Sequence, residues 1–143
     1  MTKEQWMHMY QIVGAAQEVY NVLGRGMEEP IYQEAMEKEL DIRGLKYQRE
    51  VVLHTWYKGI QLNKVYQADF VCEDVVVEFK SVNKITPDHR AQLFNYLRIT
   101  KQDRGILVNY GETNFHSERY AYDEQTDRYE LITKDNLHKY VKE

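Results

Sequence analysis

The sequence is poor in the residues that mark linkers and disulfide scaffolds. Seven glycines and two prolines among 143 residues form no linker-like stretch, so we expect a single domain over residues 1–143. Cys72 is the only cysteine, which excludes an internal disulfide and is typical of a reducing compartment. We expect Cys72 to be a small buried apolar residue.

Long apolar runs are also missing. No stretch approaches the roughly 18 apolar residues of a membrane span. The N-terminus, MTKEQWMHMYQ, has neither the basic flank nor the apolar run of a signal peptide. We therefore expect a cytoplasmic protein that makes no contact with a membrane.

An excess of positive charge is the third absence. Lys and Arg number 19 against 23 Asp and Glu, which gives a net charge of −4. This balance predicts no broad basic surface for a polyphosphate, so nucleic-acid binding would need local basic patches or metal ions. Hydrophobic residues make up 43% of the chain, enough for one sizeable core.

Apolar periodicity and capping residues predict alternating helices and strands. The expected elements are a helix over 2–23, a helix from Pro30 to Gly44, strands over 47–57, 64–72 and 75–82, a helix over 86–100, a strand over 105–110, edge strands over 119–123 and 128–132, and a short C-terminal helix. This order predicts an α+β fold with a mixed sheet, an α/β sandwich.

The stretch DFVCEDVVVEFK, residues 69–80, reads as a hairpin that carries charge. A turn at Glu73–Asp74 makes Asp69 and Glu78 cross-strand neighbours. Strand alternation predicts a core face, made of Ala68, Phe70, Cys72, Val75, Val77 and Phe79. Asp69, Glu78 and Lys80 then share the opposite face.

Two carboxylates about 5 Å apart repel by roughly 3 kcal/mol at an effective dielectric near 20. A bound cation, a shared proton, a salt bridge with Lys80 or splaying into water would offset this repulsion. The hairpin alone leaves two alternatives open: a solvated sheet face with an ordinary Glu–Lys pair, and a site for a divalent metal with hard oxygen ligands.

The spacing Asp69…Glu78-x-Lys80 resembles the D…(D/E)-x-K core of the PD-(D/E)XK nuclease superfamily. EVYNVLGRGMEEPIY resembles the motif of its GxxExxY protein family, through Gly26, Glu29 and Tyr32. YQADFVCEDVVVEFKSV resembles the two strands of that family, and HRAQLFNYL resembles its H-x-x-Q-x-x-x-Y-L helix, through His89, Gln92, Tyr96 and Leu97.

The resemblance implies a restriction-endonuclease-like αβββαβ core preceded by an extra N-terminal helix. It also implies hydrolysis of phosphodiester bonds in nucleic acid, DNA more than RNA, with Mg²⁺ as cofactor or Mn²⁺ in its place. The implied metal ligands are Asp69, Glu78, the backbone carbonyl of Phe79, and Glu29 directly or through water.

The same resemblance assigns further roles. Lys80 would orient the attacking water and stabilise negative charge, and Gln92 would position Lys80 or a substrate phosphate. His89 and Tyr96 are candidate substrate contacts. Four basic residues are candidate phosphate contacts: Lys84, Arg90, Arg98 and Lys101.

Two other functions compete with catalysis. The chain could be a non-catalytic nucleic-acid-binding relative that keeps the nuclease fold, or a protein-interaction module that pairs through its 12 tyrosines. A small nuclease with a net negative charge could also need a homodimer or a partner protein to hold its substrate.

Overall fold

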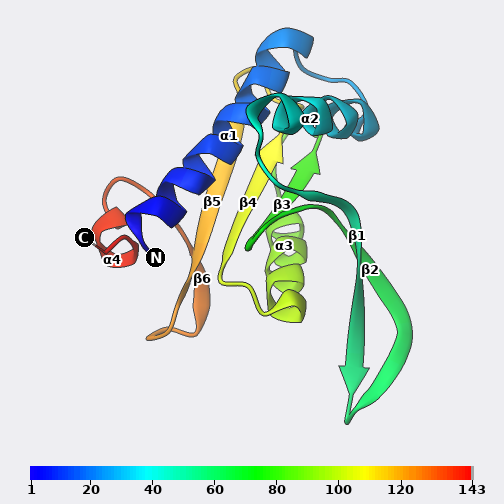
Figure 1. Cartoon of the computed structure of the whole chain (residues 1–143), viewed down its shortest axis with the longest axis vertical. Coiled ribbons are helices and arrows are strands. Elements are labelled where there is room, and N and C mark those ends of the chain that lie inside the picture. Colours follow the sequence, from blue (N-terminus) through cyan, green and yellow to red (C-terminus); the bar gives the residue numbers. More distant parts are fainter. Residues whose placement is uncertain (143) are drawn as a thin grey trace.

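The computed structural model describes residues 1–142 and contains one mixed six-stranded sheet with helices on both faces (Figure 1). The elements are α1 (Lys3–Leu23), α2 (Glu29–Arg43), β1 (Gln48–Tyr57), β2 (Ile60–Cys72), β3 (Val75–Lys80), α3 (Pro87–Thr100), β4 (Arg104–Asn109), β5 (His116–Asp123), β6 (Arg128–Leu131) and α4 (Leu137–Tyr140). The strands lie in the order β1-β2-β3-β4-β5-β6, with β3 and β4 parallel and the other neighbours antiparallel. The predicted α+β class and the αβββαβ order from α2 to β4 are confirmed, and α1 is the extra N-terminal helix.

The helices begin where the sequence places capping residues. Thr2 accepts a hydrogen bond from the backbone of Gln5 and forms a capping box with it, and α1 ends at Gly24. Thr86 caps α3 in the same way and Pro87 occupies its first turn. None of the helices within residues 1–142 combines the length and the apolar character needed to span a bilayer.

The hairpin of β1 and β2 is longer than the sequence predicts. The stretch KGIQLN, residues 58–63 between the two predicted strands, was expected to form the turn. Pairing continues to Tyr57 and Ile60. Lys58 and Gly59 between them have positive φ angles of 50° and 78°. Two consecutive positive φ angles are typical of the tight turn whose twist matches paired strands. β2 therefore begins at Ile60, four residues before the predicted start at Lys64.

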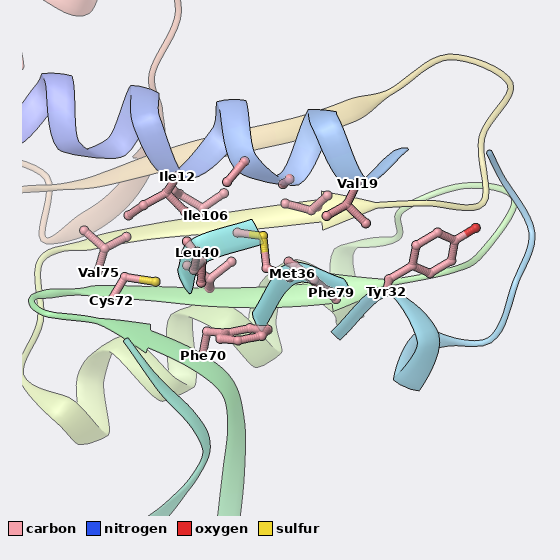
Figure 2. Close-up of a cluster of buried hydrophobic side chains, with 14 of the residues drawn as sticks. Ile12, Val19, Tyr32, Met36, Leu40, Phe70, Cys72, Val75, Phe79 and Ile106 are labelled. Carbon is pink, nitrogen blue, oxygen red and sulfur yellow. The ribbon is translucent and has the colours of Figure 1, made fainter. Parts of the chain in front are cut away.

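The first core lies between the sheet and the helices α1 and α2. Figure 2 shows side chains of both helices directed at the strands beneath them. The buried contacts join Ile12 and Met36 to Phe70, Phe79 and Ile106. Cys72 belongs to this core, and burial raises the pKa of its thiol to about 12, so it is the buried apolar residue that was expected.

The second core lies on the opposite face of the sheet, beneath α3. Val76 and Leu107 pack there against Leu93 of the helix. The hairpin face that carries Glu78 is therefore covered by protein, so of the two alternatives left open by the sequence, the solvated sheet face is wrong. Ala68 also packs in this second core, although alternation placed it in the first. The regular alternation breaks beside Glu50, whose φ of 54° interrupts the pleat of the paired strand β1.

The first turn of α3 is joined to β5 by an ion pair between half-buried Arg90 and buried Glu118. Arg90 donates two hydrogen bonds to the carboxylate of Glu118, at 2.8 and 2.9 Å. Burial alone would raise the pKa of Glu118, but hydrogen bonds from Arg90, Tyr120 and His116 outweigh it and lower this pKa to about 2. The pair fixes the helix that carries Gln92, and Arg90 is engaged within the fold.

We expect Glu118→Gln to lower the free energy of unfolding by about 2 kcal/mol at pH 7. A carboxylate whose pKa is lowered on folding stabilises the fold above its unfolded pKa of about 4.5, and this contribution is lost as the pH falls towards 2. Urea titrations at pH 7 and pH 3.5 should therefore show a difference between wild type and variant that shrinks at the lower pH. A difference that is constant with pH would contradict the assignment, and Glu124→Gln on the surface is the control.

Candidate active site

The charged hairpin has the predicted register. Phe70 pairs with Val77 and Cys72 with Val75. Beyond Phe70 the ladder between β2 and β3 ends and side chains take over its hydrogen bonds. The backbone N–H of Asp69 donates to Glu78 Oε1 at 2.8 Å, and that of Phe79 donates to Asp69 Oδ2 at 2.8 Å. Each carboxylate is thus held by the backbone of the opposite strand.

The two carboxylates are held together in an environment that disfavours their charge. The Glu78 residue is only 3% exposed. Burial, and then the charge of Asp69, raise the pKa of Glu78 well above its ordinary value. Burial also raises the pKa of Asp69, Glu29 adds to this, and the N–H of Phe79 opposes it. The nearby Lys80 lowers both pKa values without cancelling the shifts, so the pair favours a bound cation or a shared proton.

Lys80 connects this pair to α3. Its Nζ donates to Gln92 Oε1 at 2.8 Å, and Gln92 Nε2 donates to the hydroxyl of Tyr96 at 2.9 Å. The ring of Tyr96 lies 5.8 Å from that of Tyr66 on β2. The structure therefore brings Lys80 of β3 together with Gln92 and Tyr96, two residues of the predicted helix motif.

The Gly26-x-x-Glu29-x-x-Tyr32 motif places the acidic end of α2 beside the hairpin. The N–H of Gly26, at a positive φ of 86°, donates to Tyr110 O at 3.1 Å. The hydroxyl of Tyr32 accepts from the N–H of Met27 and donates to Gly24 O. These three hydrogen bonds hold the loop before Glu29, whose charge acts on Asp69.

Two shallow hollows are each lined by a residue that contacts the charged hairpin, Gln33 in the first and Gln92 in the second. The first is lined by Gly26, Met27, Glu28, Glu29, Pro30, Gln33 and Ser81. The second lies on the side of α3 and is lined by Tyr66, Asp88, His89, Ala91, Gln92, Asn95, Tyr96 and Arg98. Residues of the Gly26–Tyr32 motif and of the α3 motif are therefore accessible to solvent, on opposite faces of the sheet.

Other candidate residues have partners within the fold. His89 Nδ1 accepts from the N–H of Thr86, so this side chain completes the cap of α3 while it lines the second hollow. Tyr96 is 4% exposed and its hydroxyl accepts from Gln92. Both residues support the helix in this structure.

Sequence reasoning assigned no role to Gln33, or to Tyr66, which begins the YQAD stretch of the strand motif. Gln33 Nε2 donates to Asp69 Oδ1 at 3.0 Å. Its position four residues after Glu29 on α2 puts both on one helical face, which is a signal that could have identified it. Tyr66 stands three residues before Asp69 on β2, and its contact with Tyr96 depends on the packing of α3 against the sheet.

The donor set fits a divalent metal such as Mg²⁺. Asp69 and Glu78 offer hard carboxylate oxygens, and Glu78 Oε2 accepts no hydrogen bond from the described residues, whereas Oε1 does. Within residues 1–142 no group of three or more His, Cys, Asp or Glu side chains stands close enough to hold a metal. Among the described residues, Asp69 and Glu78 are therefore the two carboxylates that the hairpin brings together.

The fold and site together define a nuclease-like domain: a mixed sheet whose splayed hairpin presents two carboxylates and a lysine. The sequence model of the PD-(D/E)XK nuclease superfamily matches residues 7–120. The chain belongs to this superfamily, whose nucleases typically use divalent metal ions.

Among solved structures, that of SSO0001 is similar to the chain, with a TM-score of 0.50 and 25% identity. The similarity covers 68% of this chain and 52% of SSO0001, so the chain spans about half the length of that protein. No curated protein matches the chain.

Proposed function

We propose that this protein is a Mg²⁺-dependent nuclease that hydrolyses phosphodiester bonds in DNA, with Mn²⁺ able to replace Mg²⁺. The observation that carries the proposal is the pair of half-buried Asp69 and buried Glu78, each held by a backbone N–H, with Lys80 beside them. Burying two like charges in this way costs stability, and a cation offsets that cost.

Asp69, Glu78 and the carbonyl of Phe79 would hold the metal, with Glu29 contacting it through water. When bound, the metal supplies a more acidic water and stabilises charge on the phosphate. Lys80 places its ammonium near the attacked phosphate, where it orients water and stabilises negative charge. The hydrogen bond from its Nζ to Gln92 holds the ammonium in place, which suits Lys80 to orienting water and stabilising charge.

Gln92 restricts Lys80 by accepting its hydrogen bond, and Tyr96 in turn restricts Gln92. Gln33 restricts Asp69 in a similar way, by donating a hydrogen bond to its carboxylate. These residues position the charged groups from the two helices on opposite faces of the sheet. The combination of Gly26, Glu29 and Tyr32 supports membership of the GxxExxY branch within the superfamily.

Cleavage of labelled single- and double-stranded DNA and RNA with Mg²⁺ or Mn²⁺ tests the proposal. We expect DNA cleavage that EDTA abolishes and that falls by at least about 1000-fold in Glu78→Ala and Lys80→Ala, since each variant removes charge stabilisation at the reacting phosphate. Lys38→Ala, which changes an exposed lysine of α2 with no assigned role, is the matched control and should retain activity.

Cleavage that survives in both variants would place the activity elsewhere and overturn these roles. Folded protein that binds DNA in a salt-dependent manner without cleaving it would instead identify a non-catalytic relative.

A further inference from the structure

The β1–β2 hairpin projects beyond the rest of the sheet as an arm, residues 52–67 (Figure 1). The arm makes up about a ninth of the chain but holds six of the thirteen exposed large hydrophobic residues found within residues 1–142. These six are Val52, Trp56, Tyr57, Ile60, Leu62 and Val65. A projecting ribbon with this much exposed apolar surface is typical of an interaction site.

The charge of the arm differs from that of the chain. Residues 52–67 contain no Asp or Glu, although the chain has 23 of them, and they contain Lys58 and Lys64. Lys58 Nζ lies 5.5 Å from the centre of the Tyr57 ring, and Lys64 Nζ lies 5.3 Å from that of Tyr66. The arm is therefore a local basic and aromatic surface on an otherwise acidic protein.

The arm is also held in one shape. Its turn at Lys58–Gly59 has the backbone angles that pair strands tightly, and Gln61 Nε2 and His54 Nδ1 are hydrogen-bonded across it at 2.8 Å. The hydroxyl of Thr55 donates to Lys64 O at 3.3 Å. A ribbon formed before binding loses little conformational entropy when it meets a partner.

One strand connects the arm directly to the candidate active site. β2 runs from Ile60 at the tip to Asp69, nine residues at about 3.3 Å each, or roughly 30 Å. Strand alternation puts Lys64 on the same face as Tyr66, which packs against Tyr96 in the hollow beside Gln92. A partner that lies along this face would extend from the arm to Lys80.

We propose that the arm enters the major groove of double-stranded DNA while the phosphate backbone of the same duplex lies at Asp69 and Glu78. This inference rests on the proposed function, and it selects duplex DNA among the nucleic acids. The major groove of B-form DNA, about 12 Å wide, admits a two-stranded ribbon. The deep and narrow major groove of A-form RNA does not.

A projecting ribbon offers no groove that would enclose a single strand, as single-strand-binding surfaces do. A second copy of the chain is also a poor occupant, because pairing two arms would bring Lys58 and Lys64 of both copies together without a carboxylate among them. The roughly 30 Å between tip and site corresponds to about nine base pairs of duplex.

The test measures binding of a fluorescein-labelled 24-base-pair DNA duplex by anisotropy in EDTA, where metal-dependent cleavage is silent. The variant is Lys58→Glu/Lys64→Glu, and the control is Lys134→Glu/Lys139→Glu, which makes the same change of net charge at exposed lysines beyond β6. We expect the arm variant to bind at least tenfold more weakly and to reduce the dependence of log K on log salt by about two, because two phosphate contacts are lost. The control should change binding less than twofold.

A second variant, Tyr57→Ser/Ile60→Ser, removes apolar surface without changing charge. It should also weaken duplex binding, whereas Val22→Ser/Ile42→Ser, at exposed residues of α1 and α2, should not. Equal losses in the arm and control variants would overturn the proposal, as would a wild-type protein that binds no duplex. Equal or tighter binding of single-stranded DNA or double-stranded RNA of the same sequence would overturn the choice of duplex DNA.

Cleavage assays on the same proteins separate this inference from the proposed nuclease activity. Arm-dependent binding without cleavage would support the arm and reject the nuclease. Cleavage of the 24-base-pair duplex that is unchanged in both arm variants would support the nuclease and reject the arm. Sedimentation that shows a dimer in wild type and a monomer only in the arm variants, with unchanged DNA binding, would assign the arm to a second copy and overturn the proposal.

Discussion

Replacing Glu78 with glutamine is expected to stabilise the metal-free protein while removing its response to metal and its cleavage activity. In wild type the Glu78 carboxylate is almost completely buried beside Asp69, and both effects raise its pKa well above the ordinary value. Glutamine keeps a carbonyl oxygen that can accept from the N–H of Asp69, the bond that Glu78 Oε1 accepts at 2.8 Å. The substitution therefore removes a buried charge while preserving the shape and the main hydrogen bond.

We expect Glu78→Gln to raise the free energy of unfolding in EDTA at pH 8 by roughly 1–3 kcal/mol. This range is the repulsion between the two close carboxylates, reduced by the attraction of Lys80 that the variant also loses. Wild type should gain about 2.7 kcal/mol when Mg²⁺ or Mn²⁺ is present at 100 times its dissociation constant, and the variant should gain much less. Thermal unfolding with and without metal measures both quantities.

Glu34→Gln, at an exposed position of α2, is the matched control and should behave as wild type. A Glu78→Gln protein that is less stable than wild type in EDTA would show that the carboxylate pair is compensated within the fold. The case for a cation at this hairpin would then fail.

Replacing Gly111 with alanine is expected to be among the most destabilising single changes in the chain. A Cβ at this position would overlap the backbone of Val82, which cannot move aside as a flexible side chain can. Asn109 joins these two segments: its Oδ1 accepts from the N–H of Val82 at 3.0 Å and from that of Gly111 at 3.1 Å. Its Nδ2 donates to Val82 O at 2.8 Å. Separating the segments would leave the buried amide of Asn109 without these partners.

We expect Gly111→Ala to lower the free energy of unfolding by about 3 kcal/mol, from steric overlap and lost buried hydrogen bonds. Urea denaturation measures this loss. The variant should also lose activity at temperatures where it remains folded. Val82 lies two residues after Lys80, so the hydrogen bonds between Asn109 and Val82 hold the end of β3 in place.

Gly14→Ala is the control. It lies within α1, where a Cβ would meet only the end of the Arg43 side chain at 3.3 Å. Alanine favours a helix over glycine by about 1 kcal/mol, so this variant should be as stable as wild type or more stable. Equal stability of Gly111→Ala and wild type would show that the close approach of the two segments is unimportant.

The sequence by itself determined the elements and the pairing at the centre of the site. Apolar periodicity and the caps at Thr2 and Thr86 set the helices, because these signals act within one or two turns of chain. The period of two along residues 69–80 set the partners of the central hairpin, and those partners follow from alternation once the turn at Glu73–Asp74 is chosen. Local chemistry was therefore sufficient to place Asp69, Glu78 and Lys80 at one end of a hairpin.

Only the tertiary structure decided the environment of these residues. The sequence of the hairpin allowed a solvated face. Glu78 is buried because α3, which connects β3 to β4 in the chain, packs on that face of the sheet. The contact of Gln33 with Asp69 and the length of the β1–β2 arm were equally hidden, since the first depends on how α2 lies on the sheet and the second on positive φ angles at Lys58 and Gly59. Alternation specifies which side chains share a face of a strand, but the charge that a face can tolerate depends on what the rest of the chain packs against it.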